Sequence, residues 1–299
     1  MAAYSCPWCR TESYGTASSC PACGAPVDVR AVSTQSGWFE LPAIRDMARL
    51  QFGRSTCQVE GKYVPVADVN LAEGDWVYFT HHLLLWRDPA VTMKTMPMAG
   101  GWKRVFAGLP LVMLAAQGPG HIAFSRDEPG EMVAVPLHPG QTLDVREHTF
   151  LLATGAVTYN FFPTNIWYTV GSGDDAKQYY PTGMFMDRFA TAGSQPGLLL
   201  LHAAGNAFVR SLEPGQSMLV RPNALLFKDT TVQMQLHFER PHGAYRGWGT
   251  WSAKYPWLRV WGPGRVAVES AARPIEDPSV YRTMSLFGNT QSQVTEHQW

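Results

Sequence analysis

One pattern of 24 residues occurs three times in the chain without a gap. The copies begin at Leu71, Leu137 and Leu212 and read LAEGDWVYFTHHLLLWRDPAVTMK, LHPGQTLDVREHTFLLATGAVTYN and LEPGQSMLVRPNALLFKDTTVQMQ. They are offset by 66 and then 75 residues, which is the spacing of a repeated supersecondary unit. Each copy contains a turn ending in glycine, an alternating strand, a short polar turn and an apolar strand. The repeat therefore predicts an all-β architecture of similar units.

A glycine stands at the same turn position in every copy, at Gly74, Gly140 and Gly215. Turns of this type commonly need a positive φ, which glycine adopts with little strain. A second match joins residues 111–125 to residues 257–270 through a Gly-Pro-Gly turn, with a weaker copy at 193–203. We expect both kinds of turn to mark equivalent corners of the fold.

Part of the protein surface is expected to be covered. Only 16% of the 299 residues are charged, against about 25% in an ordinary soluble domain. Other copies of the same chain are the simplest cover, and a large β core with few surface positions is the alternative. The composition therefore favours a homo-oligomer.

Charge and hydropathy narrow the classes of partner. The chain has 24 basic and 24 acidic residues and no run of Lys and Arg longer than two, which disfavours nucleic acid. No apolar stretch approaches the roughly 20 residues of a membrane-spanning helix, and the N-terminal MAAYSCPWC lacks the pattern of a signal peptide. We expect a cytoplasmic protein without a transmembrane segment, which leaves peripheral membrane contact open.

Four of the five cysteines have the spacing of a zinc site. The two C-x2-C motifs, separated by ten residues, supply Cys6, Cys9, Cys20 and Cys23. Four thiolates complete a tetrahedral Zn²⁺ site and leave no position for a reacting water, so the predicted ion is structural, one per chain. Redox chemistry is the competing interpretation of paired cysteines. Cys57 is left outside the predicted ligand set.

The chain divides by composition into four parts. We expect a small zinc ribbon at 1–26, a linker at 27–38, a repeat β domain at 39–270, and a flexible or docking tail at 271–299. The segment 42–52 fits either a helix or an extended chain. The ribbon or the tail would carry any contact with an unidentified protein partner.

One stretch resembles a known family. Gly100-Gly101-Trp102-Lys103-Arg104, followed by GLPLVMLAAQGPGHIAFSRDEPGEMVAVPLHPGQTLDVREHTFLLATGAVTYN, resembles the altered-inheritance-of-mitochondria-twenty-four family, over about residues 39–270. The resemblance implies a β-sandwich of pseudo-symmetric repeats, with a fold related to the tryptophan RNA-binding attenuation protein and assembled as a trimer. It implies no established enzymatic activity, and mitochondrial members are linked to inner-membrane organisation. It supplies no catalytic residue to carry over.

The residues themselves offer no catalytic pattern. The nucleophile-elbow, zincin, P-loop and dinucleotide-binding motifs do not occur in the sequence. His81 and His82 are adjacent, so in a strand they would point to opposite faces. His82, His148 and Asn223 share one repeat position, which predicts a corner where the left-handed conformation is tolerated. We therefore expect no enzyme.

Aromatic residues crowd the segment 245–261 and include Trp248, Trp251, Trp257 and Trp261. They could form a stacking platform for a glycan or single-stranded RNA. Because no basic setting or paired polar groups surround them, a structural role is favoured, as a flap over a sheet face or as a subunit contact. The sequence as a whole predicts a non-enzymatic, self-associating β scaffold or adaptor, with a binding module for RNA or a glycan as the alternative.

Overall fold

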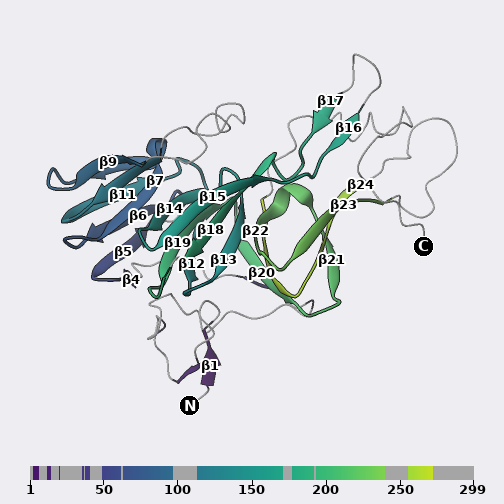
Figure 1. Cartoon of the computed structure of the whole chain (residues 1–299), viewed down its shortest axis with the longest axis horizontal. Helices are drawn as coiled ribbons and strands as arrows, with labels where there is room; N and C mark the ends of the chain where they lie inside the picture. Colours follow the sequence, from purple (N-terminus) through teal and green to yellow (C-terminus); the bar gives the residue numbers. More distant parts are fainter. Residues whose placement is uncertain are drawn as a thin grey trace, which may run out of the picture.

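The computed structural model describes residues 3–6, 12–14, 20, 36, 38–40, 49–61, 63–96, 113–170, 177–191, 193–239 and 255–271. The elements in these ranges are β-strands and two 3-10 turns, η1 (His81–Leu83) and η3 (Pro222–Ala224). The predicted all-β class is confirmed. The sheets follow one another along the longest axis of the molecule (Figure 1).

Three successive segments of the chain each contribute six strands. Unit 1 has β6 (Val66–Leu71), β7 (Trp76–Thr80), β8 (Leu84–Arg87), β9 (Thr92–Met96), β10 (Met113–Gln117) and β11 (Gly120–Ser125). Unit 2 has β12 (Glu131–Leu137), β13 (Thr142–Arg146), β14 (Phe150–Thr154), β15 (Val157–Pro163), β18 (Phe185–Thr191) and β19 (Gly197–Ala203). Unit 3 has β20 (Ala207–Leu212), β21 (Ser217–Val220), β22 (Leu225–Asp229), β23 (Gln233–Glu239), β24 (Tyr255–Trp261) and β25 (Gly264–Glu269).

Seven short strands lie outside this sixfold order. They are β1 (Ala3–Ser5), β2 (Glu12–Tyr14), β3 (Phe39–Glu40), β4 (Arg49–Phe52), β5 (Ser55–Glu60), β16 (Tyr168–Val170) and β17 (Lys177–Tyr179). The sequence left the segment 42–52 open between a helix and an extended chain. Its last four residues form β4, which is extended and pairs with β5. The rest of that segment lies outside the described residues.

The hydrogen-bonded order of strands is the same in every unit. The sixth strand lies between the first and third, as β6-β11-β8, β12-β19-β14 and β20-β25-β22. The fifth lies between the second and fourth, as β7-β10-β9, β13-β18-β15 and β21-β24-β23. The third strand of each unit also skips one residue against its sixth strand, at Leu85, Leu151 and Leu226, which are equivalent repeat positions. A β-bulge at one fixed position bends all three strands alike.

Neighbouring units join where the second strand of one pairs with the third strand of the next. We call these contacts seam 1, between β7 and β14, and seam 2, between β13 and β22. Seam 1 completes a six-stranded sheet, and seam 2 is part of a seven-stranded sheet that ends at β3. The colours of Figure 1 place unit 2 between unit 1, in blue, and unit 3, in green and yellow.

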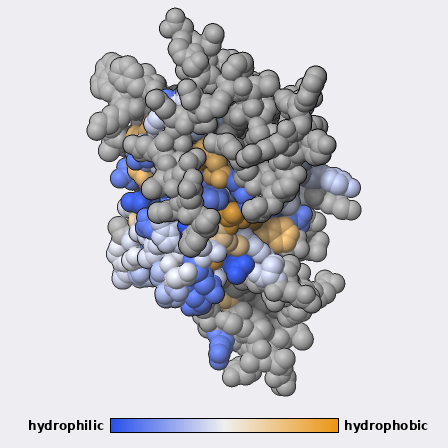
Figure 2. Space-filling model, turned by 90° about the vertical axis from the view of Figure 1, so that its right-hand side faces the viewer, coloured by the Kyte–Doolittle hydropathy of each residue, from blue (hydrophilic) through white to orange (hydrophobic). Residues whose placement is uncertain are grey.

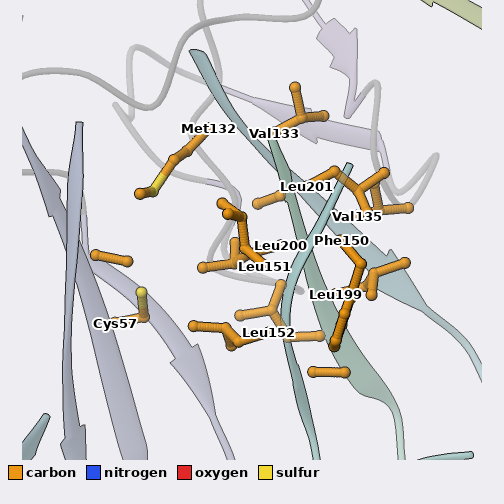
Figure 3. Close-up of a cluster of buried hydrophobic side chains, with 14 of the residues drawn as sticks. Cys57, Met132, Val133, Val135, Phe150, Leu151, Leu152, Leu199, Leu200 and Leu201 are labelled. Carbon is orange, nitrogen blue, oxygen red and sulfur yellow. The ribbon is translucent and has the colours of Figure 1, made fainter. Parts of the chain in front are cut away.

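The residues of the main core come from the six-stranded sheet, from the five-stranded sheet that ends in β4 and from the seven-stranded sheet. Figure 3 shows Leu151, Leu152 and Leu200 lying between their own strands and the strand that carries Cys57. The rings of Phe79 and Phe124 meet edge to face, with centroids 4.6 Å apart. A second cluster, which includes Leu258, lies mainly in unit 3 and extends to Met186 on β18 of unit 2. Alternating apolar residues in every strand supply these faces.

The three repeat glycines have the backbone conformation predicted for them. Their φ angles are +87° at Gly74, +79° at Gly140 and +82° at Gly215. No protein atom would lie closer than 3.9 Å to an added Cβ at these positions, so backbone strain alone opposes substitution. We expect each Gly→Val change to lower the free energy of unfolding by about 1–3 kcal/mol, and by similar amounts. Chemical denaturation of the three variants measures this, and one harmless variant beside two severe ones would contradict the equivalence.

The predicted left-handed corner is correct for only one of its three positions. His148 has a φ of +67°, whereas His82 and Asn223 are absent from the positive-φ residues of the described chain. Those two residues lie in η1 and η3. A 3-10 turn needs negative φ at each of its residues, and in η3 Pro222, whose own φ is fixed negative by its ring, begins the turn. The sequence position is shared, but two different turns close the corner.

Candidate functional site

Part of the predicted zinc ribbon falls among the described residues. Strands β1 and β2 pair antiparallel, with Ser5 opposite Glu12, so the first C-x2-C motif lies in the connection of a hairpin. Cys6 and Cys20 are both buried. Cys9 and Cys23 lie outside the described residues. A C-x2-C motif in the sequence between two paired strands is typical of sites where two thiolates bind one Zn²⁺.

Cys57 occupies a different environment. Its side chain is fully buried on β5, and burial, followed by the nearby Asp68, raises the pKa of the thiol to about 12. A thiol with so high a pKa carries almost no thiolate at neutral pH, and thiolate is the form that binds metals and reacts. Among the described residues no group of three or more His, Cys, Asp or Glu side chains could hold a metal ion.

Two of the four predicted aromatic residues can be placed. Trp257 and Trp261 lie half-buried on one face of β24, and Leu258 and Val260 on the other face enter the core. Arg259 lies between the two tryptophans on their face. Trp248 and Trp251 lie outside the described residues. The side of the molecule at the right of Figure 1 exposes apolar patches among hydrophilic residues (Figure 2). A stacking platform stays a prediction.

One cavity of about 140 Å³ lies where units 2 and 3 meet. Arg146 and Glu269 form a buried ion pair on its wall, and Glu269 also accepts a bond of 2.9 Å from the backbone N–H of Ala204. The carboxylate is therefore engaged and is not poised as a base. The Thr182 hydroxyl is buried there with no hydrogen-bond partner among the described residues. Sequence reasoning missed this cavity because its walls come from distant strands.

Two strand edges distinguish the end units from the middle one. Strand β8 is the third strand of unit 1 and ends the five-stranded sheet, while β21 is the second strand of unit 3 and ends a three-stranded sheet. In the described part of the chain, β8 is the third strand of a unit that takes part in no seam, and β21 is the second strand of a unit that takes part in no seam. An unpaired edge presents a row of backbone N–H and C=O groups to another chain.

Large apolar side chains are exposed at both edges. On β8, Leu85 is 43% and Trp86 is 52% exposed, and on β21, Leu219 is 39% exposed. The residues at the same repeat positions in the strands that form the seams are only 0–2% exposed. They are Leu151 and Leu226, equivalent to Leu85; Leu152 and Phe227, equivalent to Trp86; and Tyr78 and Asp144, equivalent to Leu219. These side chains are therefore exposed because β8 and β21 belong to the first and last units, and not because the two strands have a polar sequence.

Seam 2 contains a charged cluster around the fully buried Asp144. The Asp144 carboxylate accepts hydrogen bonds from Nε of Arg188 at 2.7 Å, from Nη2 of Arg188 at 3.1 Å and from Nζ of Lys228 at 2.8 Å. The bond to Asp144 raises the pKa of Arg188, whose guanidinium also lies 4.4 Å from the ring of Phe162. Seam 1 is apolar at the same positions, with Tyr78 opposite Ala153.

Comparison with known proteins adds a family and a fold. The model of a family described as mitochondrial biogenesis AIM24 matches residues 57–271. Among solved structures, the chain is similar to the crystal structure of protein SPYM3_0169 from Streptococcus pyogenes, with a TM-score of 0.53 and 18% identity. That match covers 73% of this chain and 94% of the other. No curated protein matches the chain.

Among the described residues, no helix is long and apolar enough to cross a bilayer. The expected cytoplasmic location and the expected protein partner at the ribbon or tail stay predictions.

Proposed function

The chain belongs to the mitochondrial biogenesis AIM24 family, and on that premise we propose that it is a self-associating β scaffold without catalytic activity. The observation that carries the proposal is the exposure of Leu85, Trp86 and Leu219 on two sheet edges whose internal counterparts are buried. Exposed apolar side chains beside an open edge favour association, because pairing satisfies the backbone groups and removes apolar area from water.

The repeated pairing of strands supports a finer description of the scaffold. The same six-strand order and the same bulge recur in each unit, which favours a β-sandwich of pseudo-symmetric repeats. Two different edges that complement each other give a heterologous contact, which closes a ring when the rotation between copies allows it. We propose a trimer, the assembly that the family resemblance implies.

Light scattering coupled to size exclusion tests self-association. The expected mass is about three times the 33.1 kDa of one chain at micromolar concentration. Replacing Trp86 with Ser is expected to reduce this mass, since that ring is exposed in the single chain. The matched control is Tyr63→Ser, which removes a ring that is 73% exposed on the connection between β5 and β6. A single chain that remains monomeric throughout would reject the proposal.

We also propose that Cys6, Cys9, Cys20 and Cys23 hold one structural Zn²⁺ per chain. The support is the spacing of the motifs, the hairpin that carries the first of them, and the burial of Cys6 and Cys20. A module of this size has little core of its own, so metal binding and folding of the ribbon are coupled. Cys6 and Cys20 join the main buried cluster, but nearly all of that cluster comes from the β strands, so we expect the β domain to stay folded without the ion.

Elemental analysis checks the zinc site. We expect about one zinc per chain, lost in Cys9→Ser and retained in the control Cys57→Ser, because the buried Cys57 thiol is protonated. Chelation is expected to leave the thermal unfolding of the β domain unchanged. Retention of zinc in Cys9→Ser would contradict the ligand set, and unfolding of the β domain on chelation would contradict its independence.

A further inference from the structure

The two internal seams follow one rule of register. Seam 1 pairs Leu152 with Phe79, Ala153 with Tyr78 and Thr154 with Val77, and seam 2 pairs Phe227 with Val145, Lys228 with Asp144 and Asp229 with Leu143. Moving from seam 1 to seam 2 shifts every third-strand residue by 75 and every second-strand residue by 66, the offsets of the sequence repeat. The same pairing is therefore used twice within one chain.

Applying the repeat offsets to the two open edges gives a third seam. We infer that β8 of one copy pairs antiparallel with β21 of the next, with Trp86 opposite Val220, Arg87 opposite Leu219 and Asp88 opposite Met218. This inference rests on the proposed self-association and specifies the surface that performs it. The occupant of each edge is a second copy of this chain.

The structure indicates that β8 and β21, and not the other sheet edges, pair between copies. The fourth strands β9, β15 and β23 are sheet edges in all three units. An open edge on a fourth strand therefore does not indicate a missing partner. Among the described residues no further unit precedes unit 1 or follows unit 3, which leaves β8 and β21 as sheet edges. They carry Leu85, Trp86 and Leu219, three of the exposed large apolar side chains of the described chain.

The contact that results is head to tail. Units 1 and 3 lie at opposite ends of the row of units (Figure 1), so one copy can offer β8 to a second copy and β21 to a third. Pairing continues from copy to copy, and it closes a ring when the rotation between copies lets the last β21 meet the first β8.

The charges at the third seam differ from those at seam 2 in a way that can be tested. Arg259 stands opposite Leu219 on β24, as Arg188 stands opposite Asp144 on β18. Arg87 of the next copy takes the place of Lys228. Leu219 therefore lies where the carboxylate of Asp144 neutralises two cations in seam 2. Nη1 of Arg87 donates to the backbone carbonyls of Asp88 and Val91, and its Nε and Nη2 have no hydrogen-bond partner among the described residues.

Two opposite charges at position 219 separate this register from a merely apolar contact. Both Leu219→Asp and Leu219→Lys remove the same exposed side chain, so a nonspecific apolar contact would weaken equally in both. In the inferred register, an aspartate at position 219 is attracted to Arg259 of its own copy and to Arg87 of the neighbouring copy. A lysine at the same position is repelled by both arginines. Analytical ultracentrifugation should give Leu219→Lys a dissociation constant at least tenfold larger than that of Leu219→Asp, in low salt. Equal dissociation constants would overturn the register.

Cysteine pairs provide a second test. Arg87→Cys with Leu219→Cys should form disulfide-linked oligomers on oxidation, because residues opposite each other across strands have neighbouring Cβ atoms. The control, Arg87→Cys with Val220→Cys, shifts one partner by one residue and so places it on the opposite face. Oligomers that form normally but crosslink equally in both pairs, or in neither, would overturn the register while leaving self-association intact. A monomeric parent chain would overturn both.

Discussion

Replacing Asp144 with alanine is expected to lower the free energy of unfolding by about 3–5 kcal/mol, the usual effect of removing one partner of a buried ion pair. Asp144 is fully buried and neutralises Arg188 and Lys228, whose own side chains cannot both reach water, since Lys228 is 5% exposed. Without the carboxylate the ammonium group of Lys228 would remain buried and uncompensated. Urea denaturation of a dilute sample measures the change.

The control for this substitution is Asp68→Ala. Asp68 pairs with His121 at 3.2 Å, but both side chains are well exposed, at 34% and 48%. An exposed pair contributes about 0–1 kcal/mol, because water and salt screen it. If Asp144→Ala were as mild as Asp68→Ala, seam 2 would not depend on its ion pairs.

Phe227→Ala should destabilise the fold by about 3–5 kcal/mol, whereas Trp86→Ala, at the same repeat position, should change unfolding of the isolated chain by under about 0.5 kcal/mol. The reason is burial: Phe227 is 2% exposed and Trp86 is 52% exposed. Thermal or urea unfolding at a concentration below the association range separates the two.

Association should show the reverse dependence. A tryptophan that becomes buried between copies commonly contributes about 2 kcal/mol, so Trp86→Ala should raise the dissociation constant roughly thirtyfold. A large loss of chain stability in Trp86→Ala, with unchanged association, would show that Trp86 supports its own unit and not a neighbouring copy.

The sequence repeat allowed the prediction of what is local in this fold. The turn glycines at 74, 140 and 215 have positive φ. Each copy of the pattern forms the two predicted strands joined by a short corner, and also the start of a third strand that was not predicted. Both follow from residues close in sequence, where turn chemistry and alternation act directly. The all-β class followed from the same signals.

What could not be predicted is the pairing between units. The Asp144 carboxylate meets residues 44 and 84 positions away, and no local pattern distinguishes Asp144 from an exposed acidic residue. Leu85, Leu151 and Leu226 are the same residue type at the same repeat position, so sequence alone could not separate the exposed one from the two that are buried. Exposure there is decided by which unit comes first and which comes last.

Because three units are fused into one polypeptide, dilution affects the contacts between chains but not the contacts between units within a chain. Seams 1 and 2 close within a chain, where the connection between units holds the partners at an effective concentration in the millimolar range for short flexible linkers. A contact between β8 and β21 of different copies depends instead on the amount of protein present. Lowering the concentration would therefore divide an assembly only into whole chains of three units, and the cell could control assembly through expression level alone.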